Sequence, residues 1–363
     1  MRHKELGSVS TFKIAAAYIG TIVGAGFATG QEVMQFFLKF GASGIVGIGL
    51  ATLLFILFGI LIMELGMSLN ADSHIKIIRH SSGKYLSVFI DAIITFFLFG
   101  ALSAMIAGAG ALFEQQFILP SIIGNIIMAA LTALTVLTGF KGVLNAISLV
   151  VPFLLISVLG MSIYSIVTSP PAIGETSVLN DGGGLIGNFF FAAILYVSYN
   201  TIISIAVLGP LGIEAGERKK IRIGAILGGL GLGLGSVLIY LALAGNVESV
   251  RYLEVPMIFI AGRISNIIVI LFAVVLIAEI YTTAVGSLYG FVKRISDSEF
   301  IKNRPDRRRI ENLIVIVATA LALLSSRLGF LNLVKYLYPV IGYAGLTLLV
   351  SLIIKRVKSR QQT

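Results

Sequence analysis

The residues of this sequence that could do chemistry begin with a glycine-rich segment near the N-terminus. Four glycines fall between Gly20 and Gly30, and Gln31 and Glu32 follow directly. Each glycine costs a helix about 1 kcal/mol relative to alanine, so a helix through this segment should unwind. Inside a membrane, unwound backbone survives only where it is buried in protein or lines a watery cavity. Close packing of small residues explains the stretch from Gly20 to Gly26 equally well, but the polar residues that follow it favour a break.

A break in this segment would expose peptide groups of opposite polarity. The amides that open the outer half of the helix would carry partial positive charge, which suits a carboxylate or another anion. The predicted substrate-binding residues of this half are Gly24, Ala25, Gly26 and Phe27. The carbonyls that end the inner half, between Gly20 and Val23, would suit a cation. Glu32 lies beyond the break, where it could gate the extracellular path or bind an amine, although a side chain that reaches for the membrane interface fits its position equally well.

A second group of polar residues lies near the middle of the sequence, within an otherwise apolar stretch. Five of the six residues from Tyr196 to Thr201 carry a polar side-chain group. Buried polar groups need partners, and Asn, Ser and Thr compete for backbone hydrogen bonds, so we expect a helix break or a polar cavity there. Hydrogen bonds to a neighbouring helix are the alternative. The predicted substrate-binding residues of this group are Tyr196, Ser198 and Asn200.

A third candidate is Glu279, which lies near the centre of an apolar stretch. A charge at the centre of a membrane helix costs about 2.5 to 3.5 kcal/mol, so this carboxyl should stay neutral, bind a cation or alternate between these states. A protonated, purely structural carboxyl is the alternative. The three histidines of the sequence, at positions 3, 74 and 80, lie outside the apolar stretches, so no metal cluster is expected within the membrane.

The elements that must position these residues are membrane helices. Of 363 residues, 57% are hydrophobic and 12% are charged, and the mean hydropathy of +1.00 excludes an ordinary soluble domain. The sequence contains no cysteine, which excludes disulfides, iron–sulfur clusters and thiolate zinc sites. About 20 apolar residues cross a bilayer as a helix, so we predict ten spans in a single transmembrane domain. The ten stretches are 11–39, 44–66, 86–112, 121–138, 143–167, 185–208, 223–243, 267–292, 310–326 and 331–354.

Lysine and arginine are distributed unevenly between the two sides that these spans define. One side holds 22 of the 27 basic residues, including both terminal segments. The positive-inside rule places this side in the cytoplasm, so we predict a multi-pass protein of the bacterial plasma membrane with cytoplasmic N- and C-termini. The net charge of +10 does not indicate nucleic-acid binding, because the basic residues lie between apolar runs instead of on one face of a soluble fold.

A polar segment rich in glycine and proline, 168–184, divides the spans five and five. Because five is odd, the two halves run antiparallel, and we predict two inverted five-helix repeats, 1–168 and 169–363. The first span of each half holds one polar interruption, and paired interruptions of this kind indicate the midplane site of a secondary transporter. Outside the spans we expect an amphipathic cytoplasmic helix or a solvated connector over 70–85, and an extracellular helical cap or hairpin over 247–262.

The stretch from Tyr18 to Glu32, with the sequence YIGTIVGAGFATGQE, resembles the start of the YkvI-type bacterial membrane proteins. These proteins form a family within the amino acid/polyamine/organocation transporters. The resemblance covers the whole chain. It implies the LeuT-type fold, which is an all-α integral membrane protein of ten transmembrane helices in a 5+5 inverted repeat, with helices 1 and 6 discontinuous at the substrate.

The same resemblance implies a sodium ion between two backbone carbonyls and two hydroxyls. The residues that match this pattern are Gly20 and Val23 in the first span and Thr282 and Thr283 in the eighth. Glu279 departs from the family pattern, because other members contribute only a backbone carbonyl at this place. A proton therefore stays as the rival of sodium for the role of coupling ion.

These features together predict a secondary active transporter that moves a small solute by alternating access, coupled to Na⁺ or H⁺. The predicted solute class is an amino acid. A non-transporting ligand receptor on the same fold, similar to spore-germination receptor subunits, is the alternative function. No set of catalytic residues is visible in the sequence, so we predict neither an enzyme nor an organic cofactor. The expected partners are the solute and the lipid bilayer, and the number of subunits stays open.

Overall fold

The computed structural model describes residues 9–71, 74–138, 143–173 and 185–361, and within these ranges the chain is helical without a β-strand. The first span comprises α1 (Thr11–Ile22), α2 (Ala25–Ala28) and α3 (Gln31–Phe36), followed by a 3₁₀ turn (Leu38–Phe40). The long helices are α4 (Ala42–Ser68), α5 (His74–Phe117), α6 (Ser121–Thr138), α7 (Val143–Thr168), α8 (Phe189–Ala215), α9 (Arg218–Ala244), α12 (Asn266–Ser296), α14 (Arg307–Ser325) and α16 (Tyr338–Gln361). The short elements are α10 (Val247–Val250), α11 (Pro256–Gly262), α13 (Glu299–Lys302), a 3₁₀ turn (Ser326–Leu328), α15 (Phe330–Asn332) and a π-helical turn (Leu333–Leu337).

Eight of these helices are long and apolar enough to cross a membrane. They are α4, α5, α6, α8, α9, α12, α14 and the α15–α16 unit. α1 and the part of α7 from Pro152 to Thr168 are shorter apolar helices. Large apolar side chains such as Leu53 and Val274 point outward and are 65% and 62% exposed, which suits contact with lipid acyl chains. The helices therefore confirm an all-α membrane protein.

The first span is broken, as predicted. Val23 and Gly24 are extended, with φ/ψ of −73°/102° and −121°/−169°, between the end of α1 and the start of α2. A second turn separates α2 from α3 at Gly30, whose φ of 83° lies in the left-handed region that favours glycine. The segment thus changes direction twice within one span, and the second change depends on the positive φ of a glycine.

The break leaves peptide groups without main-chain partners. The amide of Val23 donates to the carbonyl of Ile19, and the next amide with such a bond is that of Ala28, which donates to Gly24. Within the described chain, the carbonyls of residues 20–23 and the amides of residues 24–27 therefore have no main-chain hydrogen bond. Groups of this kind are stable in a membrane only beside a cavity or another polar partner.

The second predicted break is absent, and the prediction that helix 6 is discontinuous is wrong for this structure. α8 runs from Phe189 to Ala215 without a non-helical residue. Its polar side chains donate to main-chain carbonyls of the same helix and do not interrupt it. Asn200 Nδ2 donates to the Tyr196 carbonyl (2.9 Å), and Thr201 Oγ1 donates to the Val197 carbonyl (2.7 Å). Bonds to the carbonyl four residues earlier satisfy such side chains while the helical ladder stays intact.

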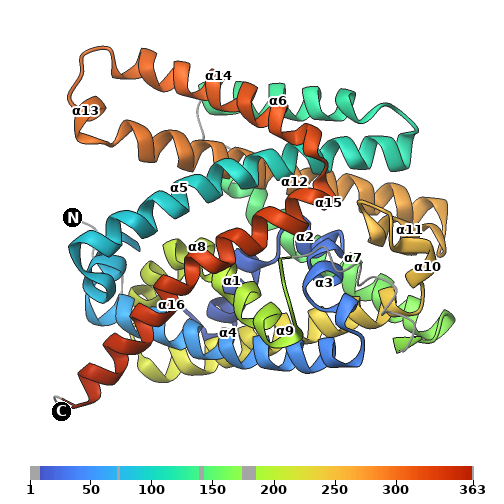
Figure 1. Cartoon of the computed structure of the whole chain (residues 1–363), viewed down its shortest axis with the longest axis horizontal. Coiled ribbons are helices and arrows are strands. Elements are labelled where there is room, and N and C mark those ends of the chain that lie inside the picture. The colour runs from blue at the N-terminus through green and yellow to red at the C-terminus, as the bar shows by residue number, and fades with distance from the viewer. Residues whose placement is uncertain (1–8, 72–73, 139–142, 174–184, 362–363) are drawn as a thin grey trace.

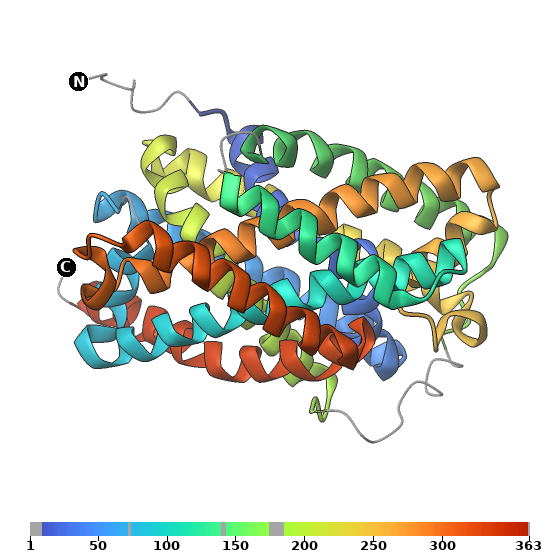
Figure 2. The ribbon, with the colours of Figure 1, turned by 90° about the horizontal axis from the view of Figure 1, so that it is seen from above.

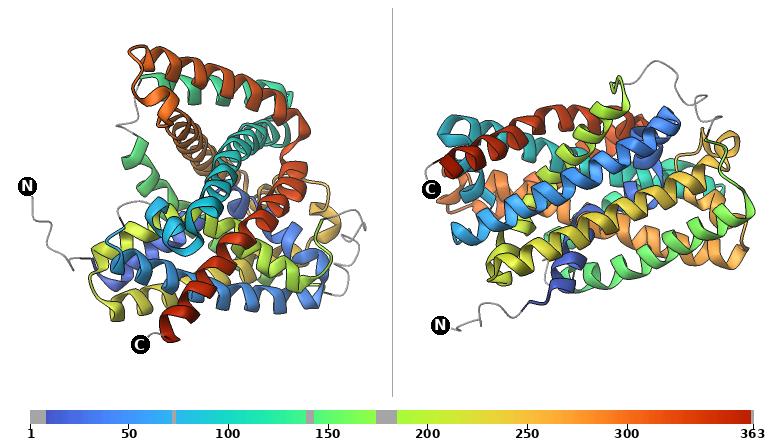
Figure 3. Two further views of the ribbon diagram at one scale, coloured as in Figure 1. Left: turned by 60° about the vertical axis from the view of Figure 1, so that its left-hand side comes forward. Right: turned by 90° about the horizontal axis from the view of Figure 1, so that it is seen from below.

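The helices form two groups that pack side by side. Figure 1 shows α6 and α14 together along one edge, with α5 and α12 beside them, and these four helices contact one another. α1, α4, α8 and α9 form the second group, which Figure 3 shows on the opposite side of the molecule. The two ends of the described chain lie toward the same end of the bundle, as Figure 2 shows, and α10 and α11 lie at the other end. The two groups contact each other directly through α5 and α8, and α2 of the broken span contacts α12 of the first group.

The two smaller elements expected outside the spans are both helical. The segment before Gly83 forms the first turns of α5, with Ile77 and Ile78 buried. Gly83 has a φ of 73° and separates these turns from the long helix that follows. α10 and α11 form the helical pair predicted over 247–262.

The most extensive packing in the second group joins α4 to α8, and glycines make it possible. A Cβ added at Gly66 would overlap the main chain at Gly209, whereas one added at Gly49, on the same helix, would meet nothing within 4 Å. Gly66→Ala is therefore expected to lower the stability of the protein by about 1 to 3 kcal/mol through overpacking. The matched variant Gly49→Ala should be neutral or slightly stabilising.

Thermal unfolding of the two purified variants in detergent checks this packing. We expect a lower midpoint for Gly66→Ala than for the wild-type chain, and no decrease for Gly49→Ala. Equal midpoints for the two variants would mean that α4 and α8 do not approach as closely as described.

Candidate functional site

A cavity of about 410 Å³ lies at the break of the first span. The broken segment 20–26 forms one wall, and Glu32 of α3 reaches into the cavity from the same span. α5, α8 and α12 supply the other walls, and Tyr338 closes one corner at the start of α16. A cavity of this size and depth is within the range of small-molecule sites.

Three helices each contribute one face to the cavity wall, and these faces show in which direction the cavity extends. The lining residues are Phe97, Leu98, Ala101 and Met105 of α5, Tyr199, Asn200, Ile203 and Val207 of α8, and Glu279, Thr282, Thr283, Gly286 and Ser287 of α12. Their spacing of three to four residues follows one helical face over two turns or more. From the break, each face continues toward the end of its helix where lysine and arginine gather. The cavity thus extends toward the basic end of the bundle, which the sequence predicts to be cytoplasmic.

Aromatic side chains close the cavity on its other side. Phe36, Phe37, Tyr196 and Tyr199, which we call the aromatic cluster, are each no more than 1% exposed. The ring centres of Tyr196 lie 5.0 Å from Phe37, 5.3 Å from Phe36 and 5.6 Å from Tyr199. Distances of 4.5 to 7 Å are those of packed aromatic pairs, so little space is left between these rings.

A second layer covers the aromatic cluster at the α11 end. The amide of Met257, in α11, donates to the carbonyl of Thr29 (3.1 Å). The side-chain amide of Gln31 donates to the carbonyl of Leu253 in the loop before α11. These bonds hold the helical pair α10–α11 and the loop before α11 against the part of the broken span that follows the break.

Glu32 occupies the place where the sequence predicts an anion receptor. Its side chain is 5% exposed, and a Cβ added at Gly26 would overlap its carboxyl oxygen Oε1. Its other oxygen, Oε2, has no hydrogen-bond partner. The hydroxyls of Tyr196 and Tyr199 lie beside the carboxyl, and neither has another hydrogen-bond partner. Gly26 therefore leaves room for a carboxyl group of the chain itself.

Glu279 is the second buried carboxyl of the cavity. It is 4% exposed, its Oε1 accepts a bond from Thr283 Oγ1 (3.3 Å), and its Oε2 has no partner. Thr282 Oγ1 donates to the main-chain carbonyl of Glu279 (3.0 Å). The hydroxyls of Thr282 and Thr283 line the same cavity as Gly20 and Val23. The structure thus brings together the residues predicted to couple an ion, with the carboxyl of Glu279 among them.

The predicted substrate-binding residues separate into two groups. Gly24, Ala25, Gly26 and Asn200 line the cavity. Phe27, Tyr196 and Ser198 do not line it. Phe27 packs on α9, where a Cβ added at Gly235 would lie 3.1 Å from its ring; Tyr196 belongs to the aromatic cluster; and Ser198 Oγ donates to the Gly342 carbonyl of α16 (2.7 Å).

Three aromatic residues that the sequence analysis did not select also line the cavity. Phe97, Tyr199 and Tyr338 come from three different helices, and the ring centres of Tyr199 and Tyr338 are 5.1 Å apart. Tyr199 lay within the polar group 196–201 and could have been chosen for its hydroxyl. Phe97 and Tyr338 carry no local signal, because their convergence depends on how α5 and α16 pack.

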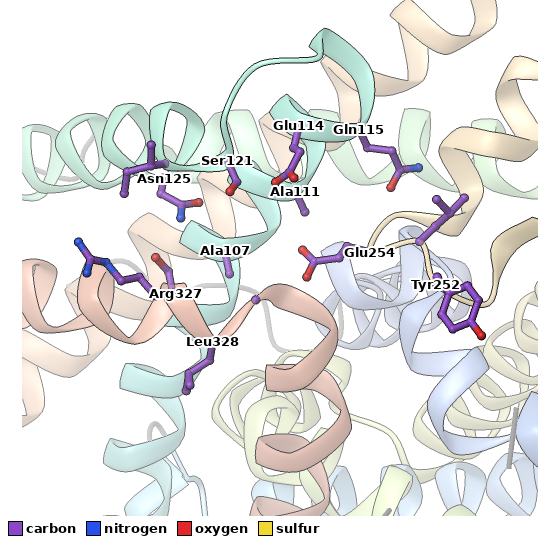
Figure 4. A pocket seen from close by; sticks show the side chains of 14 residues that line it. Ala107, Ala111, Glu114, Gln115, Ser121, Asn125, Tyr252, Glu254, Arg327 and Leu328 are labelled. Atoms are coloured by element: carbon purple, nitrogen blue, oxygen red, sulfur yellow. The ribbon is translucent and has the colours of Figure 1, made fainter. Parts of the chain in front are cut away.

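A larger pocket of about 780 Å³ lies at the opposite end, between the α5–α6 turn, the loop before α11 and the turn before α15. Figure 4 shows the carboxyls of Glu114 and Glu254 pointing into it. Glu254 Oε2 accepts a bond from the amide of Phe330 (3.3 Å), and burial raises the pKa of this carboxyl above its ordinary value. The pocket lies away from the freed peptide groups of the broken span, so we place the functional site in the smaller cavity.

Two proteins of Bacillus subtilis (strain 168) are similar to this chain over almost their whole length. The uncharacterized membrane protein YkvI is 29% identical over 361 residues, which cover 98% of this chain and 99% of YkvI. The uncharacterized protein YyaD is 27% identical over 343 residues, or 94% of this chain and 96% of YyaD. No protein-family model matches the chain. The resemblance to YkvI-type membrane proteins that the first span indicated is thereby confirmed.

Solved structures of low sequence identity share the fold. MhsT in complex with L-phenylalanine superposes with a TM-score of 0.61 at 18% identity, over 90% of this chain and 81% of MhsT. A Na⁺-coupled sialic acid symporter in a substrate-bound outward-open state superposes with a TM-score of 0.60 at 11% identity, over 89% of this chain and 73% of the symporter. Mhp1 in its inward-facing conformation superposes with a TM-score of 0.57 at 14% identity, over 98% of this chain and 92% of Mhp1. The fold is therefore of the LeuT type.

Proposed function

We propose that this relative of the YkvI-type membrane proteins is a secondary active transporter that moves a small solute by alternating access. The observation that carries the proposal is the cavity at the broken span, where freed peptide groups and two buried carboxyls face the same space. This cavity extends toward one end of the bundle, and the aromatic cluster closes the other. A central site that is closed on one side is what alternating access requires.

The proposal includes ten membrane spans in two inverted halves. The eight helices long enough to cross a bilayer combine with the broken span α1–α3 and with α7, so that residues 1–168 and 169–363 hold five spans each. Both termini then lie on the side rich in lysine and arginine, which is the cytoplasmic side of a bacterial plasma membrane.

The coupling ion is either Na⁺ or H⁺, and both proposals use the same residues. Carbonyls of Gly20 and Val23 with the hydroxyls of Thr282 and Thr283 form an oxygen donor set that suits Na⁺. The unpartnered Oε2 of Glu279 lies beside this set and could bind the cation or carry a proton. The sialic acid symporter, which shares the fold, is Na⁺-coupled, and this supports sodium by analogy of fold.

Counterflow in proteoliposomes tests the proposed function. Vesicles that contain the purified protein and a high concentration of an unlabelled solute are diluted into the labelled form, first for a panel of amino acids and then for amines. We expect transient accumulation of at least one labelled solute that empty vesicles do not show. Saturable binding without counterflow would instead indicate the receptor that the sequence left as the alternative, and would overturn the transport proposal.

Glu32 is also the proposed outer gate of this site. It lines the cavity and belongs to α3, which carries Phe36 of the aromatic cluster and is followed directly by Phe37. A movement of α3 that opened the outer side would move this carboxyl with it.

A further inference from the structure

We propose that the solute is an organic amine without a carboxylate, because Glu32 already supplies a carboxylate at the broken span. The inference rests on the proposed function and narrows its substrate class. In the sequence-based prediction, the freed amides beside Gly26 would bind the carboxylate of an amino acid. The structure places the carboxyl of Glu32 against Gly26, so a second carboxylate at this point would face a like charge.

Two buried carboxyls without a cation give the cavity its charge preference. Glu32 and Glu279 are 5% and 4% exposed, both line the cavity, and each has one oxygen without a hydrogen-bond partner. No lysine, arginine or histidine is among the residues that line the cavity in the described chain. Neutral hydroxyls lie beside both carboxyls, but a buried carboxylate without a cation is still costly, so a cationic ligand stabilises it.

The rest of the wall suits an organic cation better than a bare metal ion. Phe97, Tyr199 and Tyr338 line the cavity, with ring centres 5.1 to 6.5 Å apart. Aromatic faces attract ammonium groups and also pack on apolar carbon chains. Within the described residues, no group of three or more metal-ligating side chains is present. The freed carbonyls of residues 20–23 can accept hydrogen bonds from an ammonium group.

The two carboxyls have different proposed roles. Glu32 lies at the inner edge of the aromatic cluster and would bind the ammonium group of the solute. Glu279 bonds to Thr283 on the opposite wall, beside the predicted ion site, and would serve the coupling ion. A zwitterionic amino acid could satisfy Glu32 with its amino group. Its carboxylate would then have the free amides of residues 24–26 as donors but no basic side chain, in a cavity that already holds the two carboxyls of Glu32 and Glu279.

Thermal stabilisation by matched pairs of ligands tests the inference on the wild-type protein in detergent. Each pair differs only in the carboxylate: phenethylamine and phenylalanine, isopentylamine and leucine, cadaverine and lysine. We expect at least one amine to raise the unfolding midpoint and to bind at least about thirtyfold more tightly than its amino acid. A difference of this size is expected because the carboxylate of the bound amino acid would be a buried charge without a basic side chain as its partner. An amino acid that binds as tightly as its amine, or more tightly, would overturn the inference.

The variant Glu32→Gln assigns the effect to this side chain. It keeps the shape of the carboxyl, so the protein should fold with a midpoint near that of the wild type. We expect the affinity for the stabilising amine to fall by about thirtyfold or more, while the affinity for the paired amino acid stays the same or rises. An unchanged preference for the amine in this variant would contradict a role for Glu32.

The outcomes separate the inference from the proposed function. If amino acids bind better than amines and show counterflow, the transporter stands and the amine assignment fails. If amines bind but no solute shows counterflow, the amine assignment stands as a property of a receptor and transport fails. If no member of any pair binds, the inference is overturned whatever the counterflow result.

Discussion

Gly26→Ala is expected to reduce solute counterflow about 100-fold, the effect of a displacement of about 1 Å at a binding group. The added methyl group would overlap Oε1 of Glu32, which is the free end of a flexible side chain. The carboxyl can rotate away, so the protein should still fold and insert, but the carboxyl would no longer face the cavity as it does now. Initial counterflow rates in proteoliposomes, normalised to the amount of inserted protein, measure the effect.

Gly24→Ala is the matched control for this prediction. Gly24 lies two residues earlier in the same broken segment, and an added Cβ would meet nothing within 4 Å. Its φ of −121° is accessible to alanine. We expect counterflow close to that of the wild type. If both alanine variants transported normally, the contact between Gly26 and Glu32 would have no part in function.

Glu279→Gln is expected to abolish accumulation of the solute against its gradient, with exchange at equilibrium retained. This carboxyl is the only ionisable side chain among the residues of α12 that line the cavity, and it lies beside the ion-coupling residues. Whether the coupling ion is Na⁺ or H⁺, the neutral amide removes the charge that would bind it. Solute uptake driven by an imposed ion gradient, compared with counterflow without a gradient, measures the loss. Normal gradient-driven accumulation in the variant would contradict the assignment.

Thr283→Ala then distinguishes the two ions. The hydroxyl of Thr283 belongs to the oxygen set proposed for Na⁺ and donates to Glu279 Oε1. If Na⁺ couples transport, the sodium concentration for half-maximal uptake should rise. If H⁺ couples transport, uptake in the variant should respond to the pH gradient as in the wild type and should remain independent of sodium. A sodium-driven wild type whose variant keeps the same sodium dependence would exclude this hydroxyl from the ion site.

The break in the first span could be predicted from the sequence because its cause is local. Extended backbone at Val23 and Gly24 ends α1, and the left-handed conformation of Gly30 ends α2. The same reasoning failed for α8, because local polarity does not show where a side chain finds its partner. Asn200 and Thr201 bond to carbonyls of their own helix, so their polar groups are satisfied without a break.

The composition of the site was predictable only in part. Glu279 stood out as a central carboxyl in an apolar stretch, and the structure places it in the cavity wall. The contact between Glu32 and Gly26 was not predictable, because it depends on the turn at Gly30 that directs α3 back along α2. The ring of Tyr338 reaches the cavity through the packing of α16, and packing between distant helices leaves no mark in a single sequence.

The absence of a second break changes how the site is built without moving it. In the sequence-based account, peptide groups from two unwound spans meet at the midplane. In the structure, one unwound span meets side chains of α8, among them Asn200 and Tyr199, which line the cavity from an intact helix. The freed peptide groups of the first span are therefore the main-chain part of the site, and side chains supply the rest.

Side-specific labelling of a cysteine at position 24 tests the alternating-access account most directly. The chain has no native cysteine, and Gly24 faces open space in the cavity wall at the break. With Gly24→Cys in vesicles of known orientation, a membrane-impermeant maleimide should react from the cytoplasmic side alone in the absence of solute. With solute and the coupling ion outside, reaction from the extracellular side should appear while reaction from the cytoplasmic side decreases. Reaction from both sides at once, or from neither side under any condition, would contradict the account.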